Sequence, residues 1–193
     1  MDKAKLLGVI LTDDLKWETH TESLVKRANV RMELLRKVAS FGTNKEEKRN
    51  IYMLFIRSVL EQSCVVWHSS LTKENEDDLE RVQKSALRII LGKEINNYSD
   101  ALVEANLDSL KDRREDLCYK FAKKCTKSDK SKHMFPLRIK EHHMETREEE
   151  KYIVQHANTE RLKKSSIPYM QKLLNKHEEQ KPEQTNPKIR KPG

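Results

Sequence analysis

The chain has 193 residues, of which 36% are charged and 36% belong to the hydrophobic set AVILMFWYC. Lys and Arg number 39 against 31 Asp and Glu, and the resulting net charge of +8 suits a polyanionic partner such as nucleic acid. Only 4 Gly and 5 Pro are present, which argues against a turn-rich all-β fold and favours helices. The length fits one ordinary domain, or a small domain with a tail.

The number of cysteines and the length of the apolar runs indicate in which cellular compartment the protein resides. Cys64, Cys118 and Cys125 are odd in number and form no C-x-x-C pair, which favours reduced thiols over a disulfide framework. The first residues resemble no signal peptide, and no apolar run approaches the roughly 20 residues of a membrane span. We therefore expect an intracellular chain without a membrane segment, in either the nucleus or the cytoplasm.

The first element expected in the chain is extended. The apolar run LLGVIL at Leu6–Leu11 predicts a short buried strand, or a hairpin. A strand needs a partner for its edges, and no obvious partner strand follows. We expect it either to pair with a segment upstream of this chain or to be poorly ordered.

Helical periodicity replaces the strand pattern from Trp17 to about Phe41, and Gly42 predicts the end of that helix. Thr43–Glu46 matches a capping box and predicts a second helix that continues towards Trp67. The apolar stripe of the second helix is wide, which predicts a central position. It consists of Ile51, Leu54, Phe55, Ser58 and Val59.

Two further long helices are expected, with a turn and a short helix at residues 96–107 between them. Thr72 caps the first and Gly92 ends it, while Ser109 caps the second. The predicted inner face of the first is Leu79, Val82, Ala86, Leu87 and Ile90. The predicted inner face of the second is Leu110, Leu117, Cys118, Phe121, Ala122 and Cys125.

The apolar pattern weakens after Lys127, and one more short helix is expected at Ser166–His177, with Pro168 in its first turn. Lys181–Gly193 has three prolines and no hydrophobic cluster, so we expect it to be disordered. The fold class is therefore mainly α, with one short N-terminal strand or hairpin and a disordered C-terminal tail.

No complete catalytic, metal or cofactor site is expected. Asp13–Asp14 resembles the carboxylate pair that holds Mg²⁺ in polymerases, but a polar turn before a helix explains it more simply, and no third carboxylate is available. His142–His143, with His133 and Cys125, matches no common zinc spacing. The cysteines lie on apolar faces without an orienting partner, and Gly-rich nucleotide loops are absent.

Three rows of basic residues are candidates for phosphate contacts, which fix position without reading sequence. They are Arg27 with Arg31, then Arg81, Lys84 and Arg88 at spacings i, i+3 and i+7, and Arg113 with Arg114. The alternative is a solvated helix face with intrahelical ion pairs such as Glu80 with Lys84.

A family resemblance appears when short segments are taken in order. They are LGV (Leu7–Val9), DLKW (Asp14–Trp17) with His20, IRSVLE (Ile56–Glu61) with VW (Val66–Trp67), LERVQK (Leu79–Lys84), ALRIILG (Ala86–Gly92) and SSIPYMQKLLN (Ser165–Asn175). Together their order and spacing resemble the reverse transcriptases of non-LTR retrotransposons, the jockey-like and chicken-repeat-like clades most of all. The resemblance extends from Lys5 to Asn175. The chain departs from the family's pattern at Thr21 and at Gln62–Cys64.

The resemblance implies the part of the enzyme that follows the catalytic palm. The [FY]-x-D-D hairpin that holds the metal is absent, so the chain is expected not to catalyse, and Mg²⁺ is expected only for the full-length parent enzyme. The expected partners are the palm and a template–primer duplex or element RNA, bound weakly and in a salt-dependent way. The expected divisions are 1–16, a primer-grip strand; 17–92, a thumb-like helical bundle; 93–127, connector helices; 128–180, a weakly ordered connector; and 181–193, the tail.

The resemblance puts Lys16, Trp17 and His20 nearest the primer, and the three basic rows along the duplex. The alternative is a small helical protein-interaction module with no nucleic-acid role. This alternative is favoured if the basic rows lie on separate faces of the folded protein. An enzyme of unrelated chemistry would need a pocket with several converging titratable groups.

Overall fold

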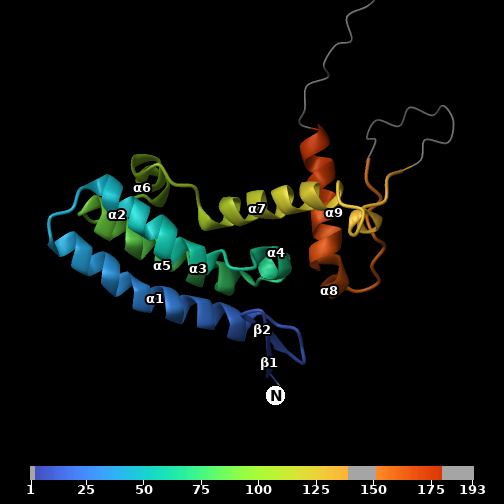
Figure 1. Ribbon diagram of the computed structural model, residues 1–193, viewed down its shortest axis with the longest axis horizontal. Coiled ribbons are helices and arrows are strands. Elements are labelled where there is room, and N and C mark those ends of the chain that lie inside the picture. Colours follow the sequence, from blue (N-terminus) through green and yellow to red (C-terminus); the bar gives the residue numbers. More distant parts are fainter. Residues whose placement is uncertain (1–2, 139–150, 180–193) are drawn as a thin grey trace, which may run out of the picture.

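The computed structural model describes residues 3–138 and 151–179, and over these the fold is mainly helical, as predicted (Figure 1). Two strands form an N-terminal hairpin, and the helices that follow build an elongated bundle with a second, smaller cluster at one end. The predicted disordered tail at 181–193 and the histidines His142 and His143 lie outside the described residues.

The hairpin consists of β1 (Lys3–Leu6) and β2 (Val9–Thr12), which pair antiparallel with Leu6 opposite Val9. Leu7 and Gly8 form the turn with φ of +48° and +86°, and positive φ at both central residues suits the twist of a hairpin. The apolar run Leu6–Leu11 is therefore not one strand, because its second and third residues turn the chain. The partner of β2 is β1 of this same chain, whose side chains are all exposed, so the expectation of a partner upstream of the chain or of a poorly ordered strand was wrong.

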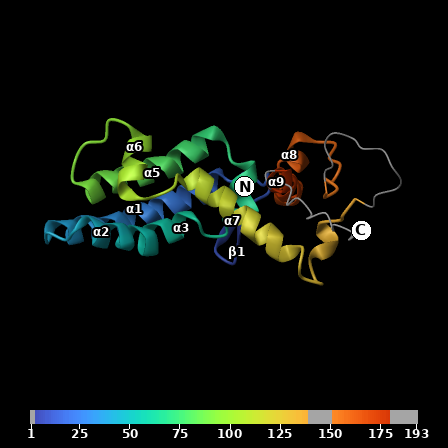
Figure 2. The same ribbon diagram turned by 90° about the horizontal axis from the view of Figure 1, so that it is seen from above.

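Helices α1 (Glu18–Ser40) and α5 (Lys73–Leu91) pack against each other in the bundle (Figure 2). The helical period of this segment predicts an apolar stripe at Leu24, Ala28, Met32, Leu35 and Ala39, and the first four are buried whereas Ala39 is only partly buried. The whole expected inner face of α5 is buried, its cap at Thr72 accepts a hydrogen bond from the Asn75 backbone, and Gly92 ends it with φ of +67°.

The segment between α1 and α5 is less regular than predicted. It consists of α2 (Lys45–Ile51), a π-helix η1 (Tyr52–Arg57), α3 (Ser58–Leu60), α4 (Cys64–Trp67) and a 3₁₀ turn η2 (His68–Ser70). The capping box at its start uses Asn44 and Glu47, one residue later than the expected Thr43 and Glu46.

The π-helix changes which side chains face the core. Tyr52 and Ile56 are buried, while Leu54 and Phe55 are 68% and 48% exposed. The prediction of Leu54, Phe55 and Ser58 as core positions was therefore wrong, since Ser58 is exposed as well. Ser63, with φ of +53°, then interrupts the helix that was expected to continue to Trp67.

Helices α6 (Tyr98–Ala105) and α7 (Leu110–Cys125) follow α5, and Ser109 caps α7 as predicted. On α7 two side chains differ from the expected pattern. Phe121, predicted to face inward, is 43% exposed, whereas Arg114, predicted to lie on the surface, is completely buried. The described chain continues through η3 (Lys132–Met134) and α8 (Glu160–Lys163) to α9 (Ser166–Glu179).

Two hydrophobic cores share α7. The first extends from Leu24 in α1 to Leu110 at the start of α7. The second gathers Cys118, Ala122 and Cys125 of α7 with Met170, Leu173 and Leu174 of α9, together with Phe135 and Tyr152. Figure 1 shows α9 crossing the far end of α7, so α7 connects the bundle to the C-terminal cluster.

Candidate functional site

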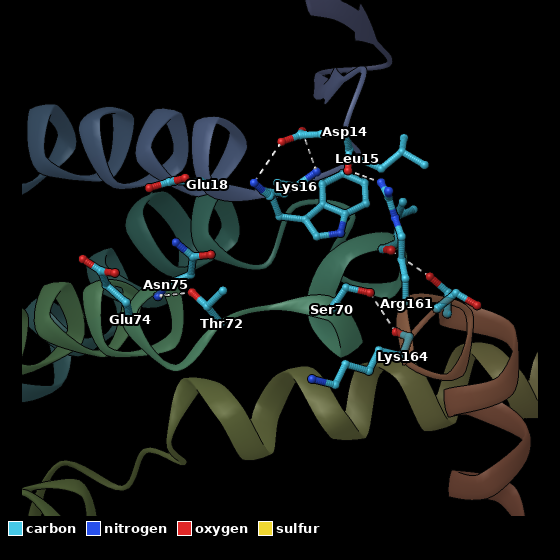
Figure 3. Close-up of a pocket in the computed structure, with 14 residues that line it drawn as sticks. Asp14, Leu15, Lys16, Glu18, Ser70, Thr72, Glu74, Asn75, Arg161 and Lys164 are labelled. Atoms are coloured by element: carbon cyan, nitrogen blue, oxygen red, sulfur yellow. Dashed lines mark hydrogen bonds and ion pairs between the residues drawn. The ribbon is translucent and has the colours of Figure 1, made fainter. Parts of the chain in front are cut away.

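A cavity of about 570 Å³ lies where the hairpin end, the bundle and the C-terminal cluster meet (Figure 3). Four segments line it: the turn 14–18, the α4–η2 region at Val66 and Ser70, the start of α5 at 72–75, and residues 161–166. Hydrogen bonds hold the walls together, because Ser70 Oγ donates to the Lys164 carbonyl and Ser166 Oγ donates to the Val66 carbonyl, both at 2.7 Å.

The turn after β2 presents two of the predicted residues, Lys16 and Trp17, to the cavity. Asp14 fixes this turn by accepting hydrogen bonds from Thr12 Oγ1 at 2.6 Å and from the Lys16 backbone at 3.1 Å. These bonds lower the pKa of Asp14 to about 2, so the carboxylate holds no proton at neutral pH. Leu15 adopts a φ of +47° at the tip of the turn.

Three helices begin at the wall of the cavity: α1 after Trp17, α5 after Thr72, and α9 at Ser166. A helix N-terminus carries unsatisfied N–H groups and a partial positive charge. Their convergence favours an anion at this end of the molecule, and Glu18 and Glu74, in the first turns of α1 and α5, offset part of that effect.

The charged side chains at the cavity are segregated. Figure 3 shows Glu18 and Glu74 on one side and Arg161 and Lys164 on the other. Lys16, whose side chain is 74% exposed, forms an ion pair with Asp14 at 3.3 Å. The Arg161 guanidinium donates to the Asp14 carbonyl oxygen and so joins residue 161 to the turn before α1.

Arg161 and Lys164 were not among the predicted site residues. They belong to a stretch of weak apolar pattern, and only the basic run at residues 161–164, directly before the segment SSIPYMQKLLN, points to them in the sequence. Their proximity to Lys16 depends on the packing of α9 against α7, α4 and η2, which no local pattern specifies.

His20, predicted to lie near the primer, is completely buried and does not line the cavity. Its Nδ1 accepts a hydrogen bond from the Ile10 backbone at 3.3 Å, and its ring contacts Trp17 and Trp67 edge to face. Burial lowers the pKa of His20. His20 thus joins β2 to α1, and it is not on a surface that a nucleic acid can reach.

The basic rows of α1 and α5 are exposed, but each member has an intramolecular partner. On α1, Arg27 donates to Gln62 Oε1 at 3.0 Å and Arg31 donates to the Phe55 carbonyl at 2.6 Å. On α5, Arg81 pairs with Asp78 at 2.7 Å, Lys84 lies 4.9 Å from the centre of the Tyr98 ring, and Arg88 pairs with Glu94 at 3.4 Å. The two rows thus contact different neighbouring segments.

The ion pair suggested for Glu80 and Lys84 is replaced by another arrangement. Glu80 accepts a hydrogen bond from the Tyr98 hydroxyl at 2.5 Å and from the Lys111 backbone at 2.8 Å, at the N-terminus of α7. The carboxylate therefore stabilises the start of a neighbouring helix rather than a cation on its own helix.

Arg113 and Arg114 have structural contacts. Arg113 Nε pairs with Glu61 at 3.1 Å in a half-buried position. Arg114 is 0% exposed, its Nε donates to His68 Nδ1 at 3.3 Å, and its guanidinium lies 5.9 Å from the Trp67 ring. Arg114 therefore does not lie on a surface that phosphates can contact, contrary to the prediction.

Comparison with known proteins yields no relative. The chain matches no protein family, no curated protein and no solved structure. Within residues 3–138 and 151–179, no three His, Cys, Asp or Glu side chains are grouped to hold a metal ion, and no helix is both long and apolar enough to cross a membrane.

Proposed function

We propose that this chain is the part of a non-LTR retrotransposon reverse transcriptase that follows the palm, and that it binds the template–primer duplex without catalysing. One observation carries the proposal. Lys16, Trp17, Arg161 and Lys164 converge with three helix N-termini on a single cavity. That cavity lies at the end of the hairpin whose LGV segment resembles the primer grip.

The chemistry of these groups suits a nucleic-acid backbone. Arg161 offers a planar guanidinium that can bind phosphate oxygens through two parallel hydrogen bonds, and the lysines act as point charges. Trp17 offers an aromatic face for a base or sugar. A volume of about 570 Å³ is in the range of small-molecule pockets and accommodates one nucleotide unit. Binding of this kind is independent of sequence.

The test is fluorescence anisotropy with a labelled RNA–DNA hybrid duplex over a series of salt concentrations. The logarithm of the affinity is expected to fall linearly with the logarithm of salt concentration. Lys16→Ala, Arg161→Ala and Lys164→Ala are each expected to weaken binding several-fold and to reduce the salt slope by about 1. The matched control is Lys37→Ala, which removes one exposed positive charge from the opposite end of α1.

The proposal fails if the duplex does not bind at low salt, or if Lys37→Ala weakens binding as much as Lys16→Ala. The second outcome would mean that net charge alone attracts the duplex. The purified chain is also expected to extend no primer in the presence of Mg²⁺, and metal-dependent extension would refute the non-catalytic part.

A small helical protein-interaction module is the second candidate. Two observations favour it: the basic rows of α1 and α5 contact different neighbours, and the π-helix turns Leu54 and Phe55 outward. It predicts no duplex binding at low salt. It also predicts that an apolar fluorescent dye binds the native protein, and that this binding is lost when Leu54 and Phe55 are both replaced by Ser.

A further inference from the structure

Two of the three cysteines lie against each other at the junction of the two cores. Cys64 belongs to α4 and the first core, whereas Cys118 belongs to α7 and the second. They are 3% and 1% exposed, and α4 packs directly on α7 (Figure 1). Arg114 of α7 donates a hydrogen bond at 3.3 Å to His68, which directly follows α4, and each cysteine lies four residues, about one helical turn, from one member of this pair. The two cysteines are therefore neighbours across the contact between α4 and α7, although 53 residues separate them in the chain.

The two thiols are not equivalent. The neighbouring Cys118 thiol lowers the pKa of Cys64, and the Cys64 thiol, together with burial, raises the pKa of Cys118. Burial and Glu61 act to raise the pKa of Cys64, whereas Arg114 lowers it further. Cys118 is thus the protonated thiol, and Cys64 is the sulfur that accepts negative charge more readily.

Arg114 provides an independent reason for an anion at this position. It is completely buried, and in the described structure its two terminal nitrogens, Nη1 and Nη2, have no hydrogen-bond partner. A buried cation without an anion is costly, so a negative charge beside it is stabilised. Both sulfurs interact electrostatically with Arg114.

We propose that Cys64 and Cys118 form a redox-active dithiol that is oxidised by a hydroperoxide, with Cys64 as the attacking thiolate and Cys118 as the resolving thiol. The Cys64 sulfur attacks one peroxide oxygen, the O–O bond breaks, and the leaving hydroxide takes a proton to become water. Cys64 is then a sulfenic acid. The Cys118 sulfur attacks the Cys64 sulfur and displaces a second water. Two thiols and one hydrogen peroxide thus give one disulfide and two waters.

Hydrogen peroxide is the appropriate oxidant because both thiols are buried. A molecule of this size needs only a small local opening between α4 and α7, whereas a bulky disulfide reagent needs the helices to separate. The product links the first core to the second covalently and fixes α7 on α4. Cys125 does not compete for Cys118, because seven residues along one helix separate their Cα atoms by roughly 10.5 Å, beyond the reach of a disulfide.

The experiment treats the full chain with hydrogen peroxide, blocks the remaining thiols with N-ethylmaleimide, and identifies cross-linked peptides by mass spectrometry. A Cys64–Cys118 disulfide is expected, with Cys125 alkylated, and the Cys125→Ser control is expected to form the same disulfide at the same rate. In Cys118→Ser, a sulfenic acid at Cys64 is expected to be trapped by dimedone, with little trapping at Cys125.

Two results would overturn the proposal. The first is a disulfide that joins Cys125 or a second chain in place of the 64–118 pair. The second is equal reactivity of Cys64 and Cys125 in the wild type. The second measurement needs no substitution, because peroxide oxidation of each cysteine is followed in the native chain by peptide mass. It therefore decides the question even if Cys118→Ser fails to fold, which circular dichroism would reveal.

Discussion

Arg114 Nε donates a hydrogen bond to His68 Nδ1 at 3.3 Å, in the region where α7 crosses from the first core to the second. Since Nδ1 accepts, the proton of the neutral ring is on Nε2, which lies 3.4 Å from the Tyr169 hydroxyl on α9. A row of three side chains thus joins α7, η2 and α9, and it requires His68 to be uncharged.

His68 makes stability depend on pH. Burial and the neighbouring Arg114 and Lys111 lower its pKa from 6.5 to about 4, against the opposing effect of Glu115. The unfolded chain therefore binds this proton at a higher pH than the folded chain does. The contribution of uncharged His68 to the free energy of unfolding is fully present above about pH 6.5, falls as pH decreases, and has been lost at about pH 4. The difference between the two pKa values corresponds to roughly 3 kcal/mol in the free energy of unfolding.

Urea denaturation followed by circular dichroism between pH 4 and 7.5 measures this effect. His68→Gln is expected to flatten the pH dependence, leaving the smaller effect of His20, whose pKa is also lowered by burial. His133→Gln is the control, because His133 is exposed in η3. An unchanged pH profile in His68→Gln would contradict the assignment.

The helical fold was predictable from local patterns. The inner face of α5 and the caps at Thr72 and Ser109 follow from periodicity and side-chain chemistry that act within one helix, and each is observed. The π-helix at Tyr52–Arg57 was not predictable in this way, because one extra residue per turn shifts every later position. Leu54 and Phe55 are exposed there, and Tyr52 and Ile56 are buried in their place.

The candidate site was only partly predictable. Lys16 and Trp17 were identified from the resemblance, and they line the cavity. Arg161 and Lys164 were missed, because contacts between segments more than 90 residues apart bring them there, such as Ser70 with Lys164. Arg114 was assigned to the surface by its residue type, since an arginine rarely occupies a position that is completely buried.

The capping box of α2 uses other residues than the sequence pattern predicts, and substitutions can distinguish the two caps. Asn44 Oδ1 accepts from the Glu47 backbone at 2.9 Å, and the Glu47 carboxylate accepts from the Asn44 backbone at 3.2 Å. Asn44→Ala is therefore expected to lower the free energy of unfolding by about 1 kcal/mol in urea denaturation. Glu46→Ala, at the position that the sequence pattern favours, is expected to change it by less than about 0.5 kcal/mol. The reverse order would show that Thr43 and Glu46 form the cap.

Gln83 is a fully buried amide in the first core, and all of its hydrogen bonds are internal. Its Oε1 accepts from the Tyr52 hydroxyl at 2.5 Å, and its Nε2 donates to the Tyr98 hydroxyl at 3.0 Å and to the Asp108 carbonyl at 2.8 Å. Gln83→Leu leaves the buried Tyr52 hydroxyl unpaired, so a loss of about 2 kcal/mol in unfolding free energy is expected.

Adding Tyr52→Phe to Gln83→Leu removes both partners of that bond and is expected to recover part of the loss. Gln155→Leu is the matched control, because Gln155 is exposed, and it is expected to change stability by less than about 0.5 kcal/mol. A double variant less stable than Gln83→Leu alone would show that the Tyr52 hydroxyl has another function in the core.

Glu61 pairs with two arginines, Arg57 at 3.4 Å and Arg113 at 3.1 Å, and the Glu61 side chain is only 14% exposed. Glu61→Gln removes the negative charge and leaves two guanidinium groups close together with reduced access to water. A loss of about 1–3 kcal/mol in unfolding free energy is expected, because a partly buried charge loses its counter-ion. Glu33→Gln is the matched control, since the pair of Glu33 with Arg36 is exposed on both sides, and exposed pairs contribute little. Equal losses in the two variants would mean that burial does not strengthen the Glu61 pair.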